Sequence, residues 1–561
     1  MNSRPAHEKS RGILTRCGAL CATLVLAGCV GPFARNDYLA FQAPPEQLHD
    51  IEAVRLEDRS RSDPVSVEDA TEQVISKVVE PPEPPAKVTV SLEEVRAAAL
   101  ARNLDLAVEL LSPAIAQASV DEEEAKFEST FFGDIRRSRS DSPTPTPLIA
   151  GSQTDFTSFD FGVSIPLRSG GQVIVDLPFS ETDTNNPSAF LNPSYSTDLR
   201  FSVSQPLLRN GWQRTSTYSI RVMKHQKQIA DARTKLEAIR VLANADKAYW
   251  RLYAAQRELV LRQQQYELSM TQLEQARRRV AAGDVAGIEV TRAESGVSQR
   301  LEAIIIAETL MRSRQRDLKR VMNRDDLPMN GPTAIELTTP PQPVGLDLDP
   351  EALADFALAN RMEMLELELQ LAIDASTVDF RRNAALPLVT LDYTYNINGL
   401  GLTYNDAFDQ LPDHSFEDWS LGVRAEVPLG NEAAKAGVHR AILQRLQRLA
   451  TKRQREVAIR QEVFEALDQF QQNWQRILAA RQEAILNGRT YEAERRQFEV
   501  GQRTSTDVLD AAARLAEAQS REIQALADYQ ISQVDIAFAT GTLLGHDRVR
   551  WEATDPADLE N

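Results

Sequence analysis

The stretch that decides the fold is residues 496–545, RQFEVGQRTSTDVLDAAARLAEAQSREIQALADYQISQVDIAFATGTLLG, near the end of a chain of 561 residues. In this stretch a helical pattern ends at Gly501, a short polar turn follows, and a second helical pattern begins around Asp507. A glycine after one helix and an acidic residue at the start of the next are the usual signals of such a turn. Residues 278–299, RRVAAGDVAGIEVTRAESGVSQ, repeat the arrangement with a turn at Gly283. We therefore predict a helical hairpin at the same place in each half of a duplicated chain.

The duplication can be measured along the chain. ALARNLDLAVEL, which starts at Ala99, aligns with ALANRMEMLELE, which starts at Ala357, at an offset of 258. VSQPL at 203–207 aligns with AEVPL at 425–429 at an offset of 222, and the glycine turns align at 218. The first half is therefore 258 − 218 = 40 residues longer, and 258 − 222 = 36 of these lie before residue 206. This excess is enough for one additional hairpin.

Residues 1–28 have the features of an export signal. Four basic residues precede an apolar run over 17–27, and small residues end the run just before Cys29. The pattern resembles a bacterial lipoprotein signal, which implies that Cys29 becomes the lipid-bearing first residue of the mature chain. An ordinary secretory signal or a single anchor helix are the alternatives, although the run is too short to span a bilayer. Val30 after the cysteine resembles the sorting pattern for the outer membrane.

The composition excludes several functional classes. The three cysteines lie at positions 17, 21 and 29, so the mature chain has no disulfide and no cysteine metal site. The six histidines are scattered without metal-binding spacing, and we expect neither a metal nor a cofactor. Loss of residues 1–28 removes four basic residues and one acidic residue, so the net charge moves from −18 to −21. That charge argues against nucleic acid and suits a pore that attracts cations. With no nucleophile–base pair or phosphate loop, the chain is not expected to be an enzyme.

Two long segments carry a helical pattern. No glycine or proline occurs between Trp212 and Ala282, and one helix over these residues would span roughly 105 Å. Apolar residues recur in this segment at heptad-like spacing, which packs helices side by side in a supercoil. The second half repeats the pattern over 438–500, interrupted only by Gly488, and again over 502–540.

Between the helices the apolar residues alternate with a period of two. Strands of about ten residues with this alternation are typical of outer-membrane barrels, and also of soluble sandwiches. The combination with very long helices and an export signal favours the barrel. The strands are expected at about 127–136, 156–166, 172–179, 197–205, 388–397 and 419–427.

From about residue 90 to residue 546 the chain resembles the TolC-like outer membrane efflux family. The resemblance is most specific in VGQRTSTDVLDA at 500–511 and in ATGTLL at 539–544. It implies an α+β fold with long antiparallel coiled-coil hairpins that form a periplasmic tunnel, and strands from three chains that close one transmembrane barrel in the outer-membrane lipid. It also implies a homotrimer that works with a periplasmic adaptor and an inner-membrane pump.

The domain boundaries expected from this reading follow the repeat. A Pro-rich tether separates the lipid anchor from the first repeat, and Ser91 with Glu94 is expected to form a capping box where periodic structure begins. The predicted parts are the signal peptide at 1–28, the lipidated N-terminus and linker at 29–88, the first repeat at 89–330, a linker at 331–347, the second repeat at 348–546 and a C-terminal tail at 547–561.

The resemblance also assigns roles at the turns. In the family the tip of the tunnel closes, and the acidic pair at the positions of Asp507 and Asp510 forms the narrowest ring. Three copies would place six carboxylates at one constriction, because residues three apart share a helix face. The alternative is that these carboxylates only stabilise the helix start, with Thr504 or Ser505 as its cap.

The same resemblance implies a gate latch between neighbouring hairpins, formed by Arg503 and Glu289. Two departures weaken it: Ile288 and Phe498 stand where the family has hydroxyl groups. We expect the latch to be weaker or to be built differently.

The function expected from the sequence is export, as the outer-membrane channel of a tripartite efflux pump or a type I secretion system. The alternative is a lipid-anchored periplasmic coiled-coil scaffold without a pore. Drugs, metal ions, solvents and proteins all stay open as cargo. The 36-residue excess predicts two further strands that join the sheet, giving six strands per chain and eighteen in a trimer, rather than twelve with a hairpin folded outside the membrane.

Overall fold

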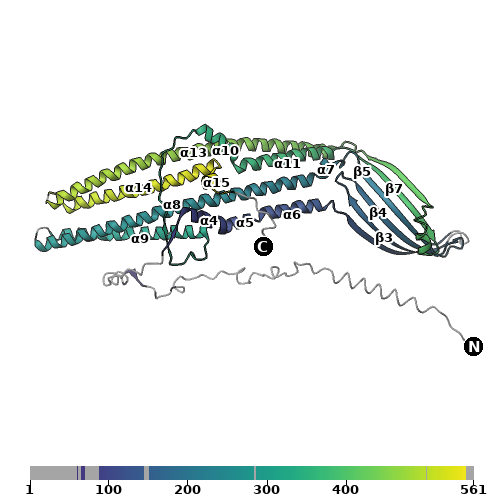
Figure 1. Cartoon of the computed structure of the whole chain (residues 1–561), viewed down its shortest axis with the longest axis horizontal. Coiled ribbons are helices and arrows are strands. Elements are labelled where there is room, and N and C mark those ends of the chain that lie inside the picture. The colour runs from purple at the N-terminus through teal and green to yellow at the C-terminus, as the bar shows by residue number, and fades with distance from the viewer. Residues whose placement is uncertain are drawn as a thin grey trace, which may run out of the picture. The chain divides into compact units, whose positions relative to one another are not determined.

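The structure is a computed structural model that describes residues 87–144, 151–283, 286–500 and 502–550, with a few isolated positions between 60 and 69. The chain divides into two units, and all elements discussed below belong to the unit Pro85–Asn561. In that unit Figure 1 shows strands at one end of long helices and the turns of two helical hairpins at the opposite end.

The two halves repeat the same order of elements. In the first half, α4 (Leu92–Arg102), α5 (Leu104–Glu109) and α6 (Ser112–Ala125) lead into β2 (Thr130–Asp141). In the second half, α10 (Pro350–Asn360) and α11 (Met362–Ala384) lead into β7 (Leu388–Gly401). The single helix α11 corresponds to α5 and α6 because Pro113, which lacks a backbone N–H, lies in the first turn of α6. The predicted duplication is therefore present in the structure.

Six strands form one antiparallel sheet in the order β2-β3-β4-β5-β7-β8. The prediction that the extra hairpin of the first half joins this sheet is confirmed, because β3 and β4 pair with each other and also with β2 and β5. Several strands are longer than expected, and the first begins at Thr130 rather than near residue 127. The remaining bounds are β3 (Gln153–Pro166), β4 (Gln172–Thr184), β5 (Ser194–Pro206) and β8 (Glu417–Glu426).

The two longest helices follow the sheet directly. After the short helix α7 (Gln213–Ser216), α8 (Tyr218–Ala282) runs for 65 residues, which is roughly 98 Å. In the second half α13 (Glu432–Glu499) runs for 68 residues through Gly488. Each turns back at its end, into α9 (Ile288–Met322) and α14 (Ser505–Ala539) respectively. The predicted helical hairpins are thus confirmed in both halves.

The order of the helices next to the sheet matches the order of the strands. Helix α6 packs against α8, α8 against α11, and α11 against α13. The match follows from the chain connectivity. Helices α6 and α11 directly precede β2 and β7, whereas α8 and α13 follow β5 and β8. The hairpin β3–β4 carries no helix of its own.

The main hydrophobic core lies at the middle of the helices, where heptad positions of α8 meet α4, α5 and the end of α9. Four apolar residues of the predicted heptad-like pattern are fully buried there or beside it: Leu242, Ala245, Tyr249 and Leu252. The capping box of Ser91 and Glu94 is present at the start of α4. Among the described residues, no helix combines the length and the apolar character needed to cross a membrane.

Three features were not expected from the sequence. Strands β1 (Lys87–Val90) and β6 (Ala334–Leu337) pair in parallel, so the linker predicted at 331–347 contains a strand that binds the start of the first repeat. A short helix, α12 (Tyr404–Phe408), lies in the loop between β7 and β8. After the last helix, α15 (Leu543–His546), the predicted tail begins with Asp547, whose side chain is fully buried.

Candidate functional site

One face of the six-stranded sheet is apolar across its full width. The strand register places one residue of each strand side by side in a row, and directly opposite residues in a ladder share a face. This row is Phe131, Val163, Val175, Phe201, Tyr395 and Trp419. Phe131, Trp419 and several others in the row are exposed although they are large and apolar. A continuous exposed apolar face of this kind indicates contact with another surface or with lipid.

The opposite face is polar and internally bonded across strands. Arg200 lies 3.4 Å from Asp176 on the neighbouring strand, and the Ser204 hydroxyl donates a 2.6 Å hydrogen bond to Asp392. Asn396 donates to Asp418 over 2.7 Å. One apolar and one polar face on strands of ten to fourteen residues match the alternation of strands in outer-membrane barrels.

Position 162, on this polar face, has no room for a side chain larger than that of glycine. A Cβ there would lie 2.5 Å from the ring of Phe132 and 2.7 Å from Asp176. The Phe132 ring therefore covers Gly162 across the β2–β3 pair, which ties the inserted hairpin to the first strand.

The two edge strands are exposed. Almost every residue of β2 and every residue of β8 is open to solvent in the single chain, and each strand pairs on one side only. Unpaired strand edges are templates for pairing with another chain.

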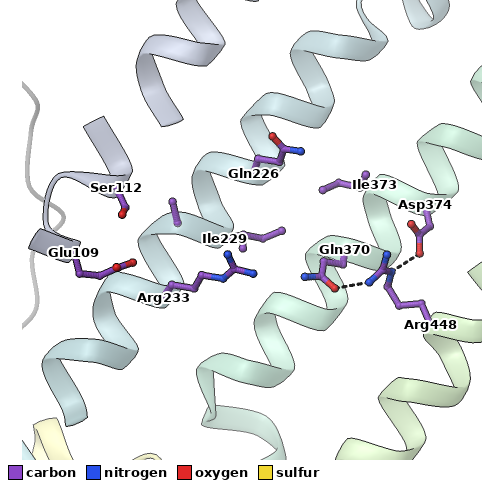
Figure 2. A pocket seen from close by; sticks show the side chains of 10 residues that line it. Glu109, Ser112, Gln226, Ile229, Arg233, Gln370, Ile373, Asp374 and Arg448 are labelled. Carbon is purple, nitrogen blue, oxygen red and sulfur yellow. Dashed lines mark hydrogen bonds and ion pairs between the residues drawn. The ribbon is translucent and has the colours of Figure 1, made fainter. Parts of the chain in front are cut away.

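A polar hollow lies on the layer of helices next to the sheet (Figure 2). It has a volume of about 460 Å³ and takes side chains from α5, α6, α8, α11 and α13. Arg448 donates 2.6 Å hydrogen bonds to Asp374 and Gln370, and Arg233 is paired with Glu366. Because both arginines are already paired, the hollow is a polar wall rather than a binding site with a free charge.

At the tip of the first hairpin, α8 ends at Gly283, which has a left-handed φ of 81°. Residues with a Cβ rarely adopt this conformation, so glycine is the residue suited to this turn. The matching tip turn at Gly501 lies outside the described residues.

The tip of the second hairpin contains the predicted acidic pair. Thr504 caps α14 in a capping box, since its hydroxyl accepts from the Asp507 N–H and the Asp507 carboxylate accepts from the Thr504 N–H. These hydrogen bonds from Thr504, first of all the one from its backbone N–H, lower the pKa of Asp507 below its ordinary value. Asp510 lies one turn later and is exposed. The helix-start role of Asp507 is therefore confirmed, and the pore-ring role stays a prediction.

The predicted latch residues are engaged within their own hairpins. The Arg503 guanidinium lies 3.1 Å from Glu494 and donates a 3.0 Å hydrogen bond to Gln497. Glu289 pairs with Arg292 at 2.7 Å. A Glu289–Arg503 pair would have to replace these contacts, and the latch stays a prediction.

A contact that the sequence reasoning missed joins the two hairpins near their tips. The guanidinium carbon of Arg279, on α8, lies 4.2 Å from the ring centre of Phe498, on α13. The sequence contains a signal for this contact, because Arg279 and Phe498 both lie within about one turn of the helix ends at Gly283 and Val500.

A buried ionic cluster was also missed. Arg96 makes two 2.8 Å hydrogen bonds to Asp246 and lies 2.7 Å from Asp547. Burial, and then the nearby charge of Asp246, raise the pKa of Asp547 to about 7, although Arg96 acts in the opposite direction. The cluster binds the segment that follows α15 to α4 and α8. Cys29, the predicted lipidation site, lies outside the described residues.

The fold combines a sheet that is apolar on one face with two helices of roughly 100 Å, which is the architecture of outer-membrane channel subunits with a helical tunnel. Residues 353–542 match the family model of the outer membrane efflux protein. Outer membrane protein TolC of Vibrio cholerae serotype O1 is 24% identical over 340 residues, which cover 60% of this chain and 75% of that protein.

Solved structures of low sequence identity share the fold. The Campylobacter jejuni CmeC outer membrane channel aligns with a TM-score of 0.58 at 16% identity, covering 84% of this chain and 88% of that one. The open state of the Neisseria gonorrhoeae MtrE outer membrane channel aligns with a TM-score of 0.57 at 16% identity, covering 81% and 89%. CusC aligns with a TM-score of 0.59 at 16% identity, covering 80% and 92%.

The match to the outer membrane efflux protein family lies within the second repeat of the chain. The resemblance inferred from the turn sequences is confirmed. The family model is described as an outer membrane efflux protein, and two of the matched structures are outer membrane channels.

Proposed function

We propose that this protein is the passive exit duct of a tripartite efflux pump or a type I secretion system, and that it carries cargo from the periplasm to the exterior. The observation that carries the proposal is the six-stranded sheet, which is apolar on one face and polar on the other. It is continuous with two helices of roughly 100 Å, each of which turns back in a hairpin. A scaffold without a pore would not need such a sheet. The duct itself needs no cofactor, because the energy enters at the inner membrane.

In this proposal the duct is a homotrimer. Both edge strands of the sheet support this assembly. The edge strands β2 and β8 are exposed, and pairing β8 of one copy with β2 of the next would close a ring of eighteen strands without an edge in lipid.

The outer helices continue these edges and carry exposed apolar residues at helical spacing. One set lies on α5 and α6 and the other on the first half of α13, the two borders of the helical layer. Such unpartnered apolar stripes favour helix packing between copies. The residues are Leu104, Val108, Leu111 and Ile115 on one border and Leu443, Leu446, Leu449 and Val457 on the other.

The hairpin regions show the same feature further from the sheet. Exposed apolar residues lie on α9 and on the second half of α13, so the contact between copies would extend toward the tips. They are Leu301, Ile305, Ile306 and Leu310 on α9 and Leu478, Ile485 and Leu486 on α13.

At the tips, Asp507 and Asp510 would form a ring of six carboxylates that attracts cations, and Arg503 with Glu289 would act when neighbouring hairpins close. A periplasmic adaptor and an inner-membrane pump would engage this end. Cys29 would anchor each mature chain in the membrane by its lipid. The predicted boundaries of the signal peptide, linkers and repeats belong to the same proposal.

Cysteine cross-linking between copies tests the duct directly. The mature chain has no cysteine besides Cys29, so a pair made of Arg136→Cys on β2 and Ser420→Cys on β8 would be the added reactive thiols. We expect dimers and trimers on denaturing gels after oxidation. Ser180→Cys, on the central strand β4, combined with the same β8 cysteine is the matched control and should give monomers.

The purified protein should also conduct ions in planar bilayers. A periplasmic scaffold would give neither edge-specific cross-links nor conductance, and that combined result would reject the proposal.

A further inference from the structure

The two hairpins of one chain touch near their tips through Arg279 and Phe498. The 4.2 Å between the guanidinium carbon and the ring centre is well inside the 6 Å range of a cation–π contact. Arg279 and Phe498 are both half-buried, so water competes less with this contact than at an open surface.

Neighbouring arginines on the same helix are engaged differently. Arg278 pairs with Glu274 one turn earlier on α8, at 3.4 Å. Arg277 pairs with Glu294 on α9, at 2.9 Å, within the same hairpin. Arg279 differs from both because its guanidinium lies over an aromatic ring of the other hairpin.

Phenylalanine is sufficient at position 498 for a physical reason. A cation is attracted by the negative face of the ring, and no hydroxyl group takes part. The absence of a hydroxyl at Phe498 and at Ile288 therefore does not leave the tip without a link between the hairpins.

We propose that Arg279 and Phe498 form a cation–π lock that holds the two hairpins together and favours the closed tip of the duct. The effect on conduction rests on the proposed function, whereas the contact lies within one chain and can be tested without it. Opening the tip separates the hairpins and returns the guanidinium to water. Each lock should shift the equilibrium between the closed and the open tip toward the closed state by about two- to fivefold. Three locks that open together should shift it by about ten- to a hundredfold.

The test compares four single variants of the full mature chain and one double variant. Phe498→Leu keeps an apolar side chain and removes the ring, and Arg279→Gln removes the cation. Phe498→Tyr keeps the ring face and is the conservative variant. Arg278→Gln is the matched control, because it removes the adjacent arginine, whose partner is on the same helix.

Two measurements are made on each variant. Amide hydrogen exchange over residues 272–282 and 490–499 reports local opening of the tips, and single-channel recording reports the open probability. We expect both to rise in Phe498→Leu and Arg279→Gln, and both to stay at the wild-type level in Phe498→Tyr and Arg278→Gln. The double variant Phe498→Leu/Arg279→Gln should exceed neither single variant, because the two residues act as one pair.

If amide hydrogen exchange in Phe498→Leu and in Arg279→Gln stays at the wild-type level, the proposed lock is wrong, whatever the conductance of these variants. An equal rise in Arg278→Gln would also overturn it, since any lost arginine would then loosen the tip. Raised exchange in the two lock variants alone, with no conductance in any protein including the wild type, would support the lock and reject the duct.

Discussion

Deleting residues 142–184 should narrow the pore without breaking the sheet. The deletion removes β3 and β4 and joins β2 to β5 through the existing loop at 185–193. Two strands are lost, so β2 and β5 remain antiparallel. Because Phe131, Val163, Val175 and Phe201 share one row of the ladder, the deletion brings Phe131 beside Phe201 with the apolar faces still in phase.

The magnitude follows from the strand count. Strands lie about 4.8 Å apart and tilt by about 40° in such barrels, so eighteen strands give a backbone diameter of roughly 36 Å. Twelve strands with the same tilt give roughly 24 Å. With about 10 Å taken up by side chains, the open widths are roughly 26 Å and 14 Å.

The assay uses a single thiol on the polar face. Ser202 lies on that face of β5, in the row of Thr130, Ser164 and Thr394, and Ser202→Cys places the thiol toward the lumen. Maleimide-linked polymers of graded size are added from outside. A polymer about 20 Å across should label the full-length protein and be excluded from the deletion variant.

Ser188→Cys in the exposed retained loop is the control and should react with every size in both proteins. The reasoning fails if the size limit at Ser202 is the same with and without the hairpin. It also fails if the full-length protein already excludes the 20 Å polymer, because the hairpin would then lie outside the wall.

Three further predictions concern the tip, the buried ionic cluster and the anchor. Replacing Asp507 and Asp510 with alanine should weaken block by multivalent cations in single-channel recordings, because six like charges would be lost from one constriction; unchanged block would leave only the helix-start role. The pKa of Asp547 is raised from 3.8 to about 7 in the folded protein, so between these pH values the folded protein holds a proton that the unfolded chain releases. The free energy of unfolding should therefore fall as the pH rises from about 4 to about 7. Asp547→Asn should remove this dependence and stabilise the protein at pH 8 by about 1–2 kcal/mol per chain, measured by denaturation at pH 5 and pH 8; an equal loss of stability at both values would contradict the assignment. Cys29→Ala should abolish incorporation of labelled fatty acid, and undiminished labelling would show that the lipid is attached elsewhere.

The sequence by itself determined the elements and their repetition. The helical hairpins, the alternating strands and the capping box at Ser91 all follow from periods and caps that act within a few residues of the chain. The cap of α14 at Thr504 was predictable for the same reason. Even the additional hairpin was visible, because a difference in length between two copies of one repeat must be accommodated somewhere.

Only the tertiary structure decided which distant residues meet. Val90 pairs with Leu337 in the parallel β1–β6 ladder, Arg96 and Asp246 bind Asp547 of the predicted tail, and Arg279 reaches Phe498 of the other hairpin. None of these contacts leaves a periodic signal, because each joins segments far apart in the chain. Their partners are set by how the helices and strands pack, and packing positions side chains that local sequence only makes available.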